Sequence, residues 1–152
     1  MTASDHAIDL VTRAARAASD KLATDIVAID VSDHLVITDT FLVASAANDR
    51  QVKAVVDGVE EELLKSGVKP IRREGEREGR WVLLDFGEVV VHVQHEEERT
   101  YYSLERLWKD CPVIELPEDA QGHKATPEEA AAGSFAATWA EEHRFDDDSE
   151  QG

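Results

Sequence analysis

The chain has few of the residues that build covalent or catalytic centres. Cys111 is the only cysteine among 152 residues, which excludes an intramolecular disulfide and a cluster of thiolate metal ligands. The sequence also lacks the glycine-bounded serine of hydrolases, the P-loop and the dinucleotide-binding glycine pattern. We therefore expect neither an enzyme nor a bound cofactor or metal.

Long apolar runs and positive charges are also scarce. No stretch approaches the length of a membrane span, and the N-terminus has no basic region followed by an apolar one, so we expect a cytoplasmic protein. Lys and Arg number 16 against 33 Asp and Glu, a net charge of −17. Such a chain does not neutralise phosphates, which argues against direct nucleic-acid binding. The charge suits a basic protein partner, or it serves only to keep the protein soluble.

The acidic excess is greatest in the last quarter of the chain. Residues 115–152 hold 11 acids and 2 bases, whereas residues 1–114 hold 22 and 14. The last quarter is too poor in apolar side chains to offset its ordering entropy. We therefore predict a folded domain over residues 1–116 and an acidic, disordered tail over residues 117–152.

Helical and strand patterns alternate along the predicted domain. An apolar stripe at helical spacing marks the helix that Asn48 caps, and Gly67 ends it. The arrangement predicts an α/β fold, with a mixed sheet of about five strands and helices packed against it. The patterns predict helices over residues 5–21, 49–65 and 100–108, and extended segments over residues 25–31, 35–37, 41–45, 70–73, 81–84, 89–93 and 113–116.

The segment from Trp81 to Val93 is the most informative because it reads as a hairpin without a polar face. A two-residue turn at Phe86 and Gly87 sets Trp81 opposite His92. Because side chains alternate along a strand, one face carries Trp81, Leu83, Val90 and His92, and the other carries Val82, Leu84, Val89 and Val91. Either this chain covers both faces, or one face binds a partner.

Histidines and acids give no defined chemical site. His92 and His95 are three residues apart, which on a strand places them on opposite faces and disfavours a metal pair. Asp30, Asp39 and Asp85 lie in or near apolar strands, where a carboxylate needs a partner. They form either a metal or acid–base site in a cleft, or caps that accept hydrogen bonds from nearby backbone.

Three stretches resemble the ribosomal silencing factor family, also called the Iojap-related family. They are ITDTFLVASAANDRQVKAVVD, EGEREGRWVLLDFGEVVVHVQ and RTYYSLERLWKDCPVIEL, and with the segments before them the resemblance covers about residues 5–116. It rests on Thr38-Asp39, Arg50-Gln51, Glu74-Gly75, Trp81, Asp85, Val91-His92, Tyr101-Tyr102, Leu104-Glu105 and Leu107-Trp108.

The resemblance implies a function that composition alone does not. Members of that family form homodimers and bind the large ribosomal subunit through its ribosomal protein fourteen. They block the joining of the two subunits, so that translation falls when nutrients are short. The family fold resembles that of nucleotidyltransferases, whose catalytic motif is absent here.

The resemblance also points to a partner-binding surface centred on Trp81. The residues expected to contribute with it are Asp85, Phe86, Glu88, His92, Tyr101, Tyr102 and Glu105. Aromatic anchors ringed by polar groups are typical of binding hot spots. The alternative is that Trp81 and the tyrosines only fill the core. Two other functions remain open: a metal-dependent enzyme that uses the three aspartates, and a dimeric adaptor for a non-ribosomal partner.

Overall fold

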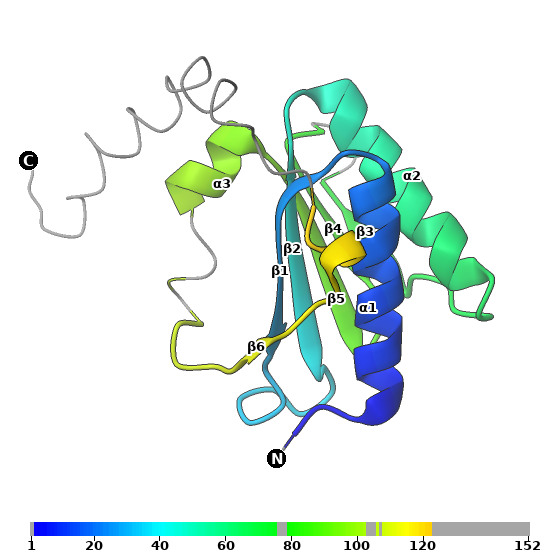
Figure 1. The fold of residues 1–152 in the computed structure, drawn as a ribbon, viewed down its shortest axis with the longest axis vertical. Coiled ribbons are helices and arrows are strands. Elements are labelled where there is room, and N and C mark those ends of the chain that lie inside the picture. Colours follow the sequence, from blue (N-terminus) through cyan, green and yellow to red (C-terminus); the bar gives the residue numbers. More distant parts are fainter. Residues whose placement is uncertain (1, 76–78, 103–105, 107, 123–152) are drawn as a thin grey trace, which may run out of the picture.

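The domain is built around one mixed β-sheet (Figure 1). The computed structural model describes residues 2–75, 79–102, 106 and 108–122. Among these, six strands pair in the order β3-β4-β5-β2-β1-β6. The elements are α1 (Asp5–Asp20), β1 (Thr24–Asp30), β2 (Thr40–Ala46), α2 (Asp49–Leu64), β3 (Arg72–Glu74), β4 (Trp81–Asp85), β5 (Val89–His95), α3 (Glu96–Tyr102), β6 (Val113–Ile114) and the 3-10 turn η1 (Glu118–Ala120).

The sheet is mixed because β2 and β5 run parallel, whereas its other strand pairs are antiparallel. A parallel pair needs a long crossover, and α2, β3 and β4 lie between β2 and β5 in the chain. The predicted α/β class and mixed sheet are confirmed. The sheet has one strand more than the five expected, and its two edge strands, β3 and β6, are its shortest.

Helices α1 and α2 lie side by side on one face of the sheet (Figure 1). Side-chain caps explain where they begin: Ser4 Oγ accepts from the Ala7 N–H at 3.0 Å, and Asn48 Oδ1 accepts from the Gln51 N–H at 2.9 Å. The predicted Gly67 stop is confirmed by its φ of +77°. The main core lies between these helices and the sheet, and includes Val11, Leu42, Val55, Leu63, Leu84 and Val91.

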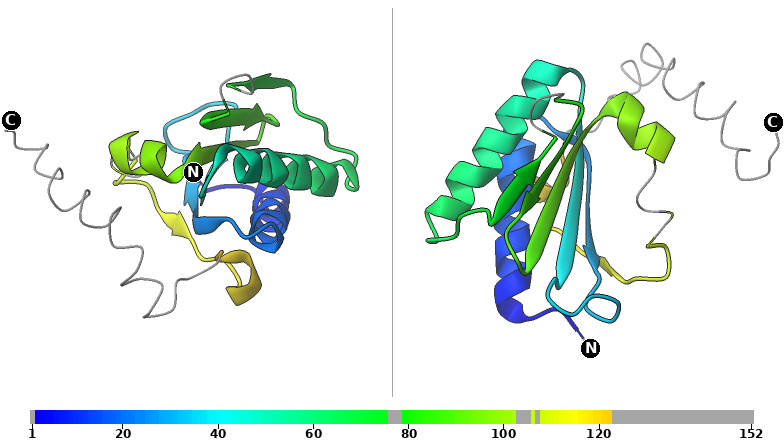
Figure 2. Two further views of the ribbon diagram at one scale, coloured as in Figure 1. Left: turned by 90° about the horizontal axis from the view of Figure 1, so that it is seen from above. Right: turned by 180° about the vertical axis from the view of Figure 1, so that it is seen from behind.

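A second, smaller apolar cluster covers the opposite face of the sheet. Its buried members are Ile29, Val31, Phe41, Val90 and Cys111, with Trp108 and Leu83 packed against them. Helix α3 lies on this side, away from α1 and α2 (Figure 2). This chain therefore covers part of both faces of the predicted hairpin and leaves Trp81 and Leu83 partly exposed.

Several predicted boundaries were wrong. Helix α3 begins at Glu96 and not at Thr100, because three glutamates in its first turn favour the positive end of the helix dipole. The segment 35–37 is not a strand: Val36 and Ile37 are 99% and 76% exposed in the loop between β1 and β2. Strand β3 starts at Arg72, two residues after the predicted start.

The predicted tail lies mostly outside the described residues. From residue 123 onward the chain is not described. Just before that point Ala120 is fully buried in the main core, and Arg16 of α1 pairs with Asp119 at 2.9 Å. The boundary at residue 116 stays a prediction.

Candidate protein-binding surface

The β4–β5 hairpin turns one residue later than the sequence suggested, which shifts the strand register by two residues. Phe86 N–H bonds to the Val89 carbonyl at 2.9 Å, so the two turn residues are Gly87 and Glu88. Gly87 has a φ of +92°, which suits the first central position of a hairpin turn. Trp81 consequently pairs with Gln94, and His92 pairs with Leu83. The predicted turn at Phe86 and Gly87 and its register were wrong.

The predicted division into two faces is nevertheless confirmed, because a register shift of two residues preserves alternation. Trp81, Leu83 and Asp85 share one face of β4. Arg72 and Glu74 of β3 pair with Asp85 and Leu83 and lie on that same face. We call these five residues the β3–β4 surface. Trp81 and Leu83 are partly buried, while Arg72 and Glu74 are exposed.

Ion pairs give the β3–β4 surface a polar rim. Arg72 lies 3.0 Å from Glu74 and 3.3 Å from Asp85. At the start of β4, Arg80 pairs with Glu98 and Glu97 of α3 at 2.9 and 2.8 Å. These hydrogen bonds to Glu98 and Glu97 raise the pKa of the Arg80 guanidinium. The apolar centre is thus flanked by charged groups, as in many protein interfaces.

The indole of Trp81 contacts the imidazole of His92. The Trp81 indole Nε1 lies 3.2 Å from His92 Nδ1. The imidazole is 6% exposed, and its ring centroid is 5.2 Å from that of Phe41, in an edge-on arrangement. Burial lowers the pKa of His92 to about 4, so its ring is neutral at pH 7.

The other predicted contact residues divide between the surface and the core. Asp85 is partly exposed, and its Oδ1 accepts from the Gly87 N–H at 2.9 Å. Glu88 is exposed in the turn, 3.1 Å from His6 of α1. Phe86 is 7% exposed and packs in the main core beneath the helices. The structure therefore does not bring Phe86 to the face that carries Trp81.

The side chains of the last three predicted contact residues lie outside the described part of the structure. Tyr101 and Tyr102 end α3, but their side chains are not described, and Glu105 lies outside the described residues. Leu83 was predicted to lie on the Trp81 face but not to contribute to binding, and Arg72 and Glu74 were not predicted as members of the surface at all. The alternation of side chains along a strand could have identified Arg72 and Glu74, because both lie on the Trp81 face once β3 is paired with β4.

The three strand-associated aspartates are caps. Asp30 accepts from Ala3 N–H and from both Ser32 N–H and Oγ, at 3.0, 3.0 and 2.6 Å. Asp39 accepts from Ser4 N–H at 2.9 Å, and Asp85 accepts from Gly87 N–H. Burial alone would raise the pKa of Asp30, but its hydrogen bonds outweigh that effect and the pKa is lowered. The interpretation of these acids as hydrogen-bond acceptors is confirmed.

Neither metal nor nucleophile chemistry emerges from the described part of the chain. No three His, Cys, Asp or Glu side chains there are placed to hold a metal ion. Burial raises the pKa of the Cys111 thiol, which disfavours the reactive thiolate. No helix in this part is long and apolar enough to cross a membrane.

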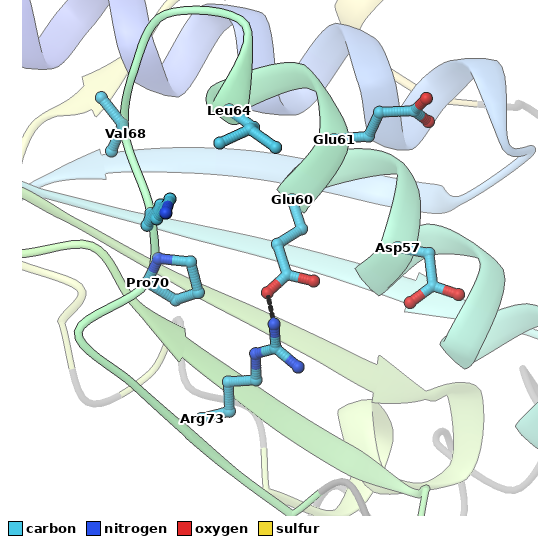
Figure 3. A pocket seen from close by; sticks show the side chains of 8 residues that line it. Asp57, Glu60, Glu61, Leu64, Val68, Pro70 and Arg73 are labelled. Atoms are coloured by element: carbon cyan, nitrogen blue, oxygen red, sulfur yellow. Dashed lines mark ion pairs between the residues drawn. The ribbon is translucent and has the colours of Figure 1, made fainter.

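A hollow of about 600 Å³ lies on the helix side of β3 (Figure 3). One wall is the acidic edge of α2, and across it Glu60 forms an ion pair with Arg73. None of the predicted contact residues lines it. The lining residues are Asp57, Glu60, Glu61, Leu64, Val68, Lys69, Pro70 and Arg73.

A family model matches nearly the whole chain. The model described as "Ribosomal silencing factor during starvation" aligns with residues 4–142. The chain belongs to the ribosomal silencing factor family. The resemblance inferred from the three sequence stretches is thereby confirmed.

Individual relatives agree with this membership. The ribosomal silencing factor of Bacillus subtilis is 43% identical over 103 residues, 68% of this chain and 87% of that protein. Its counterpart in Halalkalibacterium halodurans is 40% identical, over 71% of this chain and 92% of the relative. The chloroplastic Iojap protein of Zea mays is 33% identical, and the match spans 70% of this chain but 46% of that longer protein.

Two solved structures share the fold. A crystal structure of a Chromobacterium violaceum protein superposes with a TM-score of 0.65 and 33% identity, over 78% of this chain and 89% of the other. A Bacillus halodurans protein gives a TM-score of 0.63 and 36% identity, over 74% of this chain and all of the other.

Some residues that carry the likeness to the silencing factor family have structural roles here. Gln51 Oε1 accepts from Ala47 N–H at 2.9 Å, and its Nε2 donates to the Leu22 carbonyl at 3.1 Å, so it links α2 to the end of α1. Gly75 has a φ of +87°, and a Cβ there would overlap the Trp81 carbonyl oxygen. Only glycine lets the chain pass so close to β4.

Proposed function

We propose that this chain is a translational repressor that binds the large ribosomal subunit through its ribosomal protein fourteen. Bound there, it sterically blocks joining of the small subunit, which lowers translation under nutrient limitation. Family membership and the names of the relatives support a role at the ribosome in silencing translation. The protein acts by binding and not by catalysis, and it does so in the cytoplasm.

The observation that carries this proposal is the β3–β4 surface. It presents Trp81 and Leu83 on the face of the sheet opposite α1 and α2, with the charged pairs of Arg72 beside them. A fixed aromatic side chain with a polar rim is the usual form of a binding hot spot. The acidic chain complements a basic ribosomal protein and would steer its approach.

The competing enzyme hypothesis has little support from the described residues. Its three candidate acids, Asp30, Asp39 and Asp85, accept hydrogen bonds from backbone N–H groups of their own chain. Asp85 lies in the β4–β5 hairpin, whereas Asp30 and Asp39 bond to the residues just before α1. A shared metal between all three is not favoured by this placement.

Direct binding to purified ribosomal protein fourteen tests the partner. Trp81→Ala should weaken the dissociation constant about 30-fold, as loss of a hot-spot aromatic does. The control is Ile37→Ala, which removes a 76% exposed apolar side chain from the β1–β2 loop and should change affinity less than about twofold. No binding by the wild type would remove this partner and favour an adaptor for a non-ribosomal protein.

We also propose that the free protein is a homodimer, as the family resemblance implies. Analytical ultracentrifugation across a dilution series would show twice the chain mass at high concentration. A single species at the mass of one chain throughout the series would contradict the dimer and leave the ribosomal partner untouched.

A further inference from the structure

His92 occupies an unfavourable position for a histidine. Its side chain lies under Trp81, between β4 and β2, and is 6% exposed. Its Nε2 is buried and has no hydrogen-bond partner among the described residues. A buried polar atom without a partner destabilises a fold because it has lost its hydrogen bonds to water. A leucine or a phenylalanine would fill such a site without that loss.

The contact with Trp81 restricts His92 to one chemical form. The indole Nε1–H can only donate, so His92 Nδ1, 3.2 Å away, must accept. An imidazolium has a proton on both nitrogens and cannot accept there. The ring is therefore neutral, with its proton on Nε2. The Phe41 ring, 5.2 Å away and nearly perpendicular, packs against the imidazole from the β2 side.

We propose that His92 is a positioning residue, whose Nδ1 fixes the indole of Trp81 in the orientation that the partner binds. This inference rests on the proposed function, in which Trp81 is the central contact. Holding an aromatic side chain before binding removes an ordering cost of about 0.5–1.5 kcal/mol, equivalent to about a two- to twelvefold gain in affinity. His92 contacts no partner in this account: it acts through Trp81.

The alternative role for His92 is packing alone. The two roles differ in what a change at this position alters. If His92 only fills space, a leucine of similar volume keeps binding intact. If it orients Trp81, a leucine weakens binding although the fold is equally stable or more so, because the unpaired Nε2 is removed.

The hydrogen bond can be tested first in the free, full-length protein. In ¹⁵N-labelled wild type, a through-hydrogen-bond coupling between Trp81 Nε1 and His92 Nδ1 should be detected. The Nδ1 chemical shift should be that of an unprotonated nitrogen. Trp81→Phe assigns the indole signal. A protonated Nδ1, or an indole N–H that exchanges freely with water, would overturn the proposal.

Affinity for isolated large ribosomal subunits is measured next with three variants. His92→Leu should weaken binding about fivefold without lowering the melting temperature. His92→Asn should bind within about twofold of wild type, because Asn Oδ1 replaces Nδ1 as the acceptor. The control His34→Leu makes the same chemical change at an exposed site next to Trp108, and should bind as wild type does.

The outcomes separate the inference from the proposed function. Wild-type affinity in His92→Leu, or equal weakening in His92→Asn and His92→Leu, overturns the positioning role while Trp81 binding stands. If Trp81→Ala binds as well as wild type, or if wild type does not bind the subunit, the proposed function fails and the positioning role fails with it.

Discussion

At the scale of single residues, buried polar side chains in this domain serve local geometry. Asp30 ties the start of the chain and the turn after β1 to one carboxylate, through Ala3 and Ser32. The sequence indicated that such an acid needs donors, but it could not name them. Ala3 is 27 residues away in the chain, and only the fold brings its N–H to Asp30.

Removal of the Asp30 carboxylate should destabilise the domain. Asp30→Ala leaves two backbone N–H groups and the Ser32 hydroxyl without their acceptor, so we expect a loss of about 2 kcal/mol in the free energy of unfolding. Urea denaturation measures it. The control Asp20→Ala, at an exposed helix end, should change stability by less than about 0.5 kcal/mol. Equal effects of the two substitutions would refute the capping role.

His92 should make stability depend on pH. Its pKa is about 4 in the folded protein against 6.5 for a histidine side chain in water, so below about pH 6.5 the unfolded chain binds a proton that the folded chain does not. Stability is therefore unaffected above about pH 7, and falls by about 3 kcal/mol as the pH drops to about 4. The stability difference between His92→Leu and wild type should grow by that amount. Parallel pH curves for the two proteins would contradict it.

At the scale of elements, the sequence predicted helices better than strand registers. The cap at Asn48 and the stop at Gly67 are local signals, and both are confirmed. The hairpin register depends on which residue takes the positive φ in the turn, and a single glycine at position 87 fits either turn position. The predicted division of side chains between the two faces is still correct, because the observed register differs from the predicted one by an even number of residues.

Two glycines with positive φ should respond differently to alanine. Gly67 has a φ of +77° and no neighbour within 4 Å of an added Cβ, so Gly67→Ala should cost about 1 kcal/mol of unfolding free energy. Gly75 has a φ of +87°, and an added Cβ overlaps the Trp81 carbonyl oxygen. Gly75→Ala should therefore cost about 3 kcal/mol or more. Thermal unfolding compares the two, and similar losses would argue against the close approach to β4.

At the scale of the whole molecule, the two faces of the sheet differ in how completely this chain covers them. Helices α1 and α2 cover one face completely enough to bury Val82 and Leu84 of β4. On the opposite face, Trp81 and Leu83 of the same strand stay partly exposed. The sequence showed that neither face was polar, but which face the helices cover is a property of the assembled fold.

The central claim is that the Trp81 face blocks subunit joining at the ribosome. Sedimentation of ribosomal subunits through a sucrose gradient, with wild type or Trp81→Ala added at equal concentration, tests it most directly. We predict that wild type travels with the large subunit and diminishes the joined ribosome, while Trp81→Ala stays at the top and leaves joining intact. Wild type that remains at the top, or a Trp81→Ala variant that suppresses joining equally, would contradict the account.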